Sequence, residues 1–260
     1  MSWEGTVYAF WDQAKQDQLF TLTGMNIARC FQDADGMWYF ASRELMYYVD
    51  PATGLPQSKW TNPFTNETVP VMHVANNPVQ GPFGYSDDEW DSGTTVTGLV
   101  SFVSDINLFY PNPLFGNESY VPYAPYEQYE GGEYFKYFTP EAALKDPTTA
   151  SATGETFFTW ERTSQWLPWM AMGDRPGYLL YSCTGGAVAD GVAGLPAYMR
   201  EDIEARLPLY AHAPECLLDM ADETSWTYFD HHFDAYLTGD QFPVPAPDQV
   251  FPCSIVPAAA

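Results

Sequence analysis

The chain has 260 residues, of which 46% are hydrophobic, so it can bury a sizeable core within one large domain. Its 34 acidic and 10 basic residues give a formal net charge of −24. Because nucleic acids and anionic membranes are bound through clustered Lys and Arg, we expect neither as a partner. The acidic residues are expected to form a solvated surface.

The N-terminal residues predict a cytoplasmic protein, and that setting decides how the cysteines are interpreted. The opening Met-Ser-Trp-Glu-Gly lacks the basic and apolar regions of a signal peptide, and no stretch approaches the ~20 apolar residues of a membrane helix. Cys30, Cys183, Cys216 and Cys253 are widely spaced and form no C-x-x-C pair, so a zinc site is not expected. In a cytoplasmic setting such thiols stay reduced, and we expect no disulfide.

The first part of the chain is dominated by strand signals. A short helix is expected at residues 11–19. Aromatic residues, at 17% of the chain, favour a sheet because rings pack well on pleated surfaces, and 22 Pro and 19 Gly indicate many turns. Strands are expected at residues 37–49, 69–74, 94–109, 134–138, 156–166 and 178–183. Residues 110–132 are rich in tyrosine, which predicts a packed lid between two of these strands.

Two helices are expected after the strands. Residues 196–207 carry Met199, Ile203 and Leu207 at i, i+4 and i+8, a stripe that one helix face would bury. A second helix is expected to begin at Thr224 or Ser225, whose hydroxyl can cap it. Its buried face would include Trp226, either in the core or lining a ligand site, while Asp230 and Asp234 face water. The tail from residue 241 is expected to be extended.

These elements predict a mainly β fold: an antiparallel, lipocalin-like barrel or strongly curved sheet with a few short helices. Residues 1–260 are expected to form a single domain. The barrel would occupy about residues 20–190, and the C-terminal helices and extended tail about residues 195–260.

Residues 160–177 are the most informative stretch, with three Trp, two Met and two Arg. The alternate residues Trp160, Arg162, Ser164 and Trp166 follow a period of two, so in a strand they would share one face. A cation flanked by indoles suits an aromatic or anionic small molecule. The predicted substrate-binding residues are Tyr47, Asn76, Trp160, Trp166, Trp169 and Met170. The alternative is that these rings only fill the core of a narrow barrel.

Three residues are candidates for catalysis: His73, Arg43 and Arg162. His73 has the natural pKa range of a general acid or base, although a lone His on an apolar strand can also be a satisfied core group. Arg43 and Glu44 occupy opposite faces of one strand, so one of them must point inward if a barrel closes. A buried Arg needs a carboxylate or a ligand anion, and a structural salt bridge is the alternative for both arginines.

Metal and cofactor motifs are not evident. The run from Asp230 to Asp234 contains His231 and His232, but on a helix these two diverge by about 100°. An exposed polar helix face is therefore expected there, rather than a metal site. The sequence contains no G-x-S-x-G, phosphate loop or G-x-G-x-x-G motif, so no cofactor is expected.

Three blocks of sequence resemble a bacterial and fungal family known as domain of unknown function 1838. The first covers residues 42–76 and includes WTNPFTNE from Trp60, the second is residues 160–177, and the third is ETSWTYF from Glu223. They follow the family order from about residue 20 to residue 236. The resemblance implies a shared fold and pocket but no chemistry. Family members often carry what looks like a twin-arginine leader, which this sequence lacks.

The expected function is that of a cofactor-independent acid–base enzyme, a lyase, isomerase or cyclase acting on a hydrophobic or aromatic small molecule. His73 would move the proton, and Arg43 or Arg162 would stabilise negative charge. The alternative is a non-catalytic carrier of such a molecule, which needs only the walls of the pocket. An oligomer is compatible with the sequence.

Overall fold

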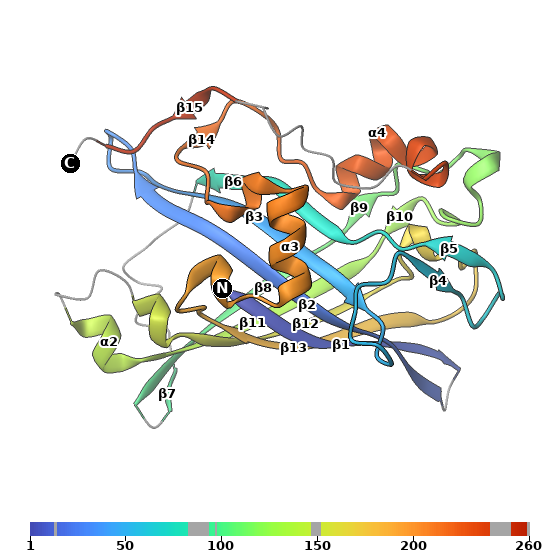
Figure 1. Ribbon diagram of the computed structural model, residues 1–260, viewed down its shortest axis with the longest axis horizontal. Coiled ribbons are helices and arrows are strands. Elements are labelled where there is room, and N and C mark those ends of the chain that lie inside the picture. Colours follow the sequence, from blue (N-terminus) through green and yellow to red (C-terminus); the bar gives the residue numbers. More distant parts are fainter. Residues whose placement is uncertain (13–14, 83–93, 97, 147–151, 240–250, 259–260) are drawn as a thin grey trace.

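The protein is described here by a computed structural model covering residues 1–12, 15–82, 94–96, 98–146, 152–239 and 251–258 (Figure 1). It is mainly β, with a curled antiparallel sheet that forms a half-barrel. The strand order in this nine-stranded sheet is β6-β3-β2-β1-β13-β12-β11-β8-β7. The strands are β1 (Ser2–Asp12), β2 (Lys15–Gln32), β3 (Trp38–Val49), β6 (Val74–Pro82), β7 (Thr94–Val96), β8 (Leu99–Asn107), β11 (Gly131–Pro140), β12 (Phe157–Ser164) and β13 (Tyr178–Gly186). The predicted fold class is confirmed.

The smaller elements cover the sheet and connect its strands. Three two-stranded ladders pair β4 (Lys59–Thr61) with β5 (Thr68–Pro70), β9 (Tyr110–Pro111) with β10 (Gln128–Tyr129), and β14 (Leu217–Leu218) with β15 (Cys253–Ile255). The α-helices are α2 (Glu141–Lys145), α3 (Ala197–Ala205) and α4 (Ser225–Leu237). The 3₁₀ turns are η1 (Glu118–Tyr120), η2 (Ala152–Glu155), η3 (Pro168–Met170), η4 (Gly191–Gly194) and η5 (Pro208–Ala211).

Three local predictions are corrected. In the described part of residues 11–19 there is no helix: residues 11–12 end β1 and residues 15–19 begin β2, and cross-strand pairs such as Asp12 with Lys15 outweigh local helix propensity. The strand expected at residues 94–109 is divided into β7 and β8, which pair with each other, and Gly98, just before β8, has a φ of +80°. The strand expected at residues 69–74 is interrupted after Pro70, which has no N–H to continue a ladder.

Both predicted helices are present. Helix α3 buries Met199 and Ile203, as its stripe indicated. Helix α4 is capped by Thr224, whose side chain accepts from the N–H of Trp226 and of Thr227. In turn, the backbone N–H of Thr224 donates to Thr227 Oγ1 at 2.9 Å, which completes a capping box. The described part of the chain contains no helix with the length and apolar character needed to cross a bilayer.

The two faces of the sheet are covered by different parts of the chain. Figure 1 shows α3 across the outer face of β2 and β3, while α4 lies beside β6, β9 and β10. The tyrosine-rich connection packs against α4, since Tyr120 and Tyr123 place their ring centroids 5.2 and 4.9 Å from that of Phe233. The predicted packed lid therefore rests on the second helix. The tail is described only from residue 251, and residues 240–250 lie outside the described ranges.

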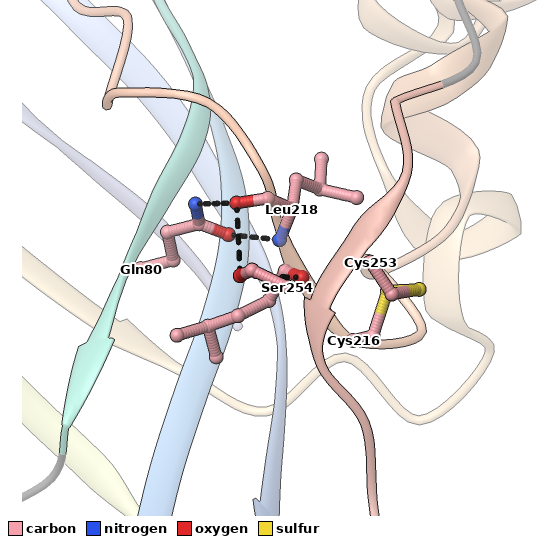
Figure 2. Close-up of a disulfide and its surroundings, with 6 residues drawn as sticks. Gln80, Cys216, Leu218, Cys253 and Ser254 are labelled. Carbon is pink, nitrogen blue, oxygen red and sulfur yellow. Dashed lines mark hydrogen bonds between the residues drawn. A yellow bond between two sulfur atoms is a disulfide. The ribbon is translucent and has the colours of Figure 1, made fainter.

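The expectation of four reduced thiols is wrong for one pair. Cys216 and Cys253 form a disulfide that links residues 37 positions apart and ties β14 to β15 (Figure 2). Cys30 and Cys183 are free. Beside the disulfide, the Gln80 amide donates to the Leu218 carbonyl and accepts from the Leu218 N–H, both at 2.8 Å. The pairing could not be inferred from spacing, because only the returning tail brings the two cysteines together.

Replacing both Cys216 and Cys253 by Ser should lower the free energy of unfolding by roughly 2–4 kcal/mol, because the unfolded chain gains the freedom of an open loop. Denaturant titration with and without a reducing agent measures this. Cys30→Ser, at an exposed free thiol, is the matched control and should change little. Equal stability of the double variant and the oxidised wild type would contradict a disulfide at this position.

Candidate functional site

The inside of the curled sheet lines a partly open cavity of about 980 Å³. Its lining includes side chains of β3, β11 and β12 and the first turn of α4. The lining is largely aromatic and includes Trp3, Tyr48, Phe135, Trp160, Trp169 and Trp226. A largely apolar cavity with a few polar groups is the usual form of a small-molecule site.

Glu44 is the central polar group on one side of this cavity. It lies on the inner face of β3 and accepts a hydrogen bond of 3.2 Å from Asn76 Nδ2 of the paired strand β6. Burial, reinforced by the negative charge of Glu133, raises the pKa of Glu44 from 4.5 to about 7. Near neutral pH this carboxyl group can both take up and release a proton, as a general acid or base must.

Arg162 is the central polar group on the other side. Its NH1 is 3.2 Å from Glu133 Oε1, its NH2 donates to the Tyr129 hydroxyl at 2.9 Å, and its guanidinium lies 5.4 Å from the Tyr181 ring centroid. Burial works against its charge, but the neighbouring Tyr129 oxygen and Glu133 carboxylate outweigh burial and raise the pKa of Arg162. Arg162 is therefore a permanent cation in the cavity wall.

The two glutamates of the cavity have different surroundings. Glu133 is ion-paired with Arg162, whereas Glu44 has an amide partner and, within the described ranges, no ion pair. An unlike pair of carboxyl groups in one cavity is a common basis for dividing acid–base roles. Because its proton is near balance at neutral pH, Glu44 is the group suited to proton transfer.

Several buried polar atoms of the cavity residues have no hydrogen-bond partner among the described residues. The donors are Trp3 Nε1, Trp160 Nε1 and Arg162 Nε, and the acceptor is Asn76 Oδ1. Each such group costs about 1–3 kcal/mol when buried. Buried polar groups left without partners are uncommon in folded proteins and point to a role other than stability.

Four of the predicted site residues line this cavity: Asn76, Trp160, Arg162 and Trp169. Trp166 does not line it, since its indole packs against Phe64 and donates to the Arg175 carbonyl at 3.0 Å. Met170 is 0% exposed and belongs to the core. Alternation along β12 thus brought Trp160 and Arg162 together, but the alternation ends with the strand at Ser164.

Tyr47 and His73 line a second cavity of about 600 Å³ on the outer face of β3, beside α3. His73 Nδ1 accepts the backbone N–H of Tyr48 at 3.1 Å, and the Tyr47 hydroxyl donates to Asp202. Burial lowers the pKa of His73 to about 4, so the ring is neutral at physiological pH. Because His73 lines this second cavity, it does not face Glu44 and Arg162, which line the first.

Arg43 lines neither of these two cavities. It is 8% exposed and faces away from Glu44, donating from Nε to Asn77 Oδ1 at 2.8 Å and from NH1 to the His212 carbonyl. Among the described residues it has no carboxylate partner, so a structural salt bridge is not its role there. Arg43 joins β6 to the segment that follows η5, and it cannot act together with Arg162 on one ligand.

The sequence reasoning missed Glu44, Glu133 and Tyr129 as cavity residues. The available signal was parity: Glu44 shares its strand face with Met46 and Tyr48, and these even positions are the ones that line the cavity. The alternation of a strand separates even-numbered from odd-numbered residues, but it does not show which of the two sets faces the inside of the sheet. In the described ranges no three His, Cys, Asp or Glu side chains cluster in a way that could hold a metal ion.

Glu44→Gln should make the protein more stable at about pH 8 and leave its stability unchanged at about pH 4. In the wild type the unfolded chain releases this proton near pH 4.5 and the folded chain near 7, so the free energy of unfolding falls as pH rises between these values. Gln does not ionise, and the gain should be roughly 1–3 kcal/mol. Denaturant titrations at both pH values test this, and an equal effect at both would contradict the raised pKa.

Trp226→Ala should weaken ligand binding more than stability. Trp226 is half-buried and lines the cavity, and its ring centroid lies 4.7 Å from that of Tyr129, with the two rings tilted. Binding of the neutral dye Nile red, followed by fluorescence, should weaken roughly 3–10-fold. Phe233→Ala, on the same helix but in the core, should instead destabilise by about 3–5 kcal/mol. The reverse pattern would place Trp226 in the core.

Comparison with known proteins places the chain in one family. A search of curated proteins found no significant match, and neither did a search of solved structures. The sequence profile described as protein of unknown function (DUF1838) matches residues 1–233, which include every residue of the cavity described above. The chain therefore belongs to the DUF1838 family.

Proposed function

We propose that the protein is a cofactor-independent acid–base enzyme, a lyase, isomerase or cyclase, acting on a hydrophobic or aromatic small molecule in the interior cavity. The observation that carries this proposal is Glu44, a carboxyl group with a pKa of about 7 held by Asn76 within an aromatic cavity. A strongly perturbed carboxyl group in a cavity is the usual sign of an acid–base site.

Glu44 takes the role first expected of His73. His73 lines the other cavity, and its pKa of about 4 makes it a weak base at neutral pH. Arg162 keeps its expected role and stabilises negative charge that develops on the substrate. Arg43 has no role in this proposal, because it lies on the opposite face of β3.

A carrier remains the second candidate. The aromatic walls alone would hold an apolar ligand, and a cavity of about 980 Å³ is at the upper end of the usual range for such sites. A carrier, however, has no use for a carboxyl group whose burial destabilises the fold at neutral pH. Glu44 therefore favours the enzyme.

The setting of the protein is also a proposal. The net charge of −24 argues against nucleic acid and anionic membranes as partners. The Cys216–Cys253 disulfide favours an oxidising compartment over the expected cytoplasm, because such bonds persist mainly where thiols are not kept reduced.

Incubation with a library of apolar metabolites in D2O, followed by mass spectrometry, tests the enzyme proposal. The wild type should yield a product or incorporate deuterium, and Glu44→Gln should reduce the rate by roughly 100-fold or more. The rate should rise with pH up to about 7 and then level, because the base must be ionised.

Glu204→Gln, at an exposed carboxylate on α3, is the matched control and should keep the full rate. Recovery of every bound compound unchanged would favour the carrier. A Glu44→Gln variant with the wild-type rate would remove Glu44 from the mechanism.

A further inference from the structure

We infer that the substrate carries a carbonyl oxygen, that Tyr129 donates a hydrogen bond to it, and that the reaction proceeds through an enolate. This inference rests on the proposed function, because it identifies the substrate class of the same cavity.

The Tyr129 hydroxyl is placed to donate into the cavity. The residue is 2% exposed, lines the cavity and ends the short strand β10. Its oxygen accepts the NH2 of Arg162 at 2.9 Å, so its own hydrogen must point elsewhere. Among the described residues no acceptor for that hydrogen is found. Because the oxygen accepts from a cation, the O–H is polarised and becomes a stronger donor.

The other unpartnered polar atoms of the cavity are mostly donors. Trp3 Nε1, Trp160 Nε1 and Arg162 Nε have no acceptor in the described part of the chain, against a single acceptor without a donor, Asn76 Oδ1. Trp160 and Arg162 are alternate residues of β12, so their donors belong to one wall. A ligand that complements this cavity brings acceptor oxygens and apolar surface.

The charges favour a neutral carbonyl over a carboxylate. The Arg162 cation is already balanced by Glu133 at 3.2 Å. A permanently anionic ligand would add a further negative charge beside Glu44 and Glu133. A ketone or an aldehyde is neutral when it binds, and its oxygen becomes negative only during the reaction, when Tyr129 and Arg162 can stabilise it.

Glu44 and Tyr129 together provide the groups that enolisation requires. The Glu44 carboxylate removes a proton from the carbon next to the carbonyl. The electron pair of that C–H bond forms a C=C bond, and the C=O pair moves to oxygen, which accepts the Tyr129 hydrogen bond. Where the substrate carries a C=C bond beyond that carbon, the enolate is conjugated, and return of the proton to the far end of the conjugated system shifts the double bond and gives an isomerase. Expulsion of a β-substituent, which takes the proton from Glu44, gives a lyase.

Binding of 4-nitrophenol tests the oxygen site, because its phenolate mimics an enolate, and 4-nitroanisole is the matched probe without an ionisable oxygen. The parent for this test is Glu44→Gln, which resembles the protonated enzyme. It should prefer the phenol, and the absorbance of the bound phenol should show an increased phenolate fraction. Adding Tyr129→Phe should weaken phenol binding roughly 10-fold or more and leave anisole binding nearly unchanged.

Two further variants make the result decisive. Trp160→Phe keeps an aromatic ring and removes one donor, so it should weaken phenol binding in the same selective way even if Tyr129→Phe folds poorly. Tyr134→Phe, at an exposed tyrosine of β11, should have no effect. No preference for the phenol in the parent, or full affinity in both Tyr129→Phe and Trp160→Phe, would overturn the inference.

The failure of this inference can be told from failure of the proposed function. If Glu44→Gln abolishes turnover while Tyr129→Phe keeps both turnover and phenol affinity, the carbonyl assignment is wrong and the acid–base function stands. If phenol binding depends on Tyr129 while Glu44→Gln turns over at the wild-type rate, the oxygen site stands and the proposed base is wrong.

Discussion

The structure depends on how the open edge of an incompletely closed sheet is covered. The nine strands end at β6 and β7, which do not pair with each other, so the curl leaves an edge at β6. The Gln80 side chain holds Leu218 there, and the Asn77 N–H donates to the Glu223 carbonyl at 2.9 Å, just before α4 begins. An exposed edge invites pairing with other chains, and here the C-terminal segment covers it. The same segment lines part of the cavity, so a single part of the chain both protects the sheet edge and helps to form the site.

The cavity contains polar groups that lower the stability of the fold. Arg162 and Glu133 neutralise each other at 3.2 Å, but the half-buried Glu44 has no ion pair among the described residues, and several donors there lack acceptors. Each of these features lowers stability. A fold optimised for stability alone would replace them with apolar groups, and sites that retain such costs are usually functional. The large hydrophobic core and the disulfide supply stabilising free energy that offsets the cost of these polar groups.

Strand β3 connects the two faces of the protein. Its even-numbered side chains, including Glu44 and Tyr48, face the cavity, while Tyr47 faces α3. The Tyr48 N–H is held by His73 Nδ1, so the histidine fixes the backbone behind the cavity without touching it. The polar groups of the outer face thus support the position of the inner ones. Because both faces of β3 are covered, Arg43 and Glu44 are each at least partly removed from bulk water and each meets a specific set of partners.

The sequence by itself determined the features that depend on near neighbours. Alternation joined Trp160 with Arg162 on one face, hydroxyl capping placed the start of α4 at Thr224 or Ser225, and aromatic content indicated a curved antiparallel sheet. Only the tertiary structure decided which face of β3 points inward, and so chose Glu44 over Arg43 and His73. It also decided the Cys216–Cys253 pair and the strand state of residues 11–12 and 15–19. Periodicity sorts side chains into two faces, but what covers each face is set by segments distant in sequence, whose contacts leave no local pattern.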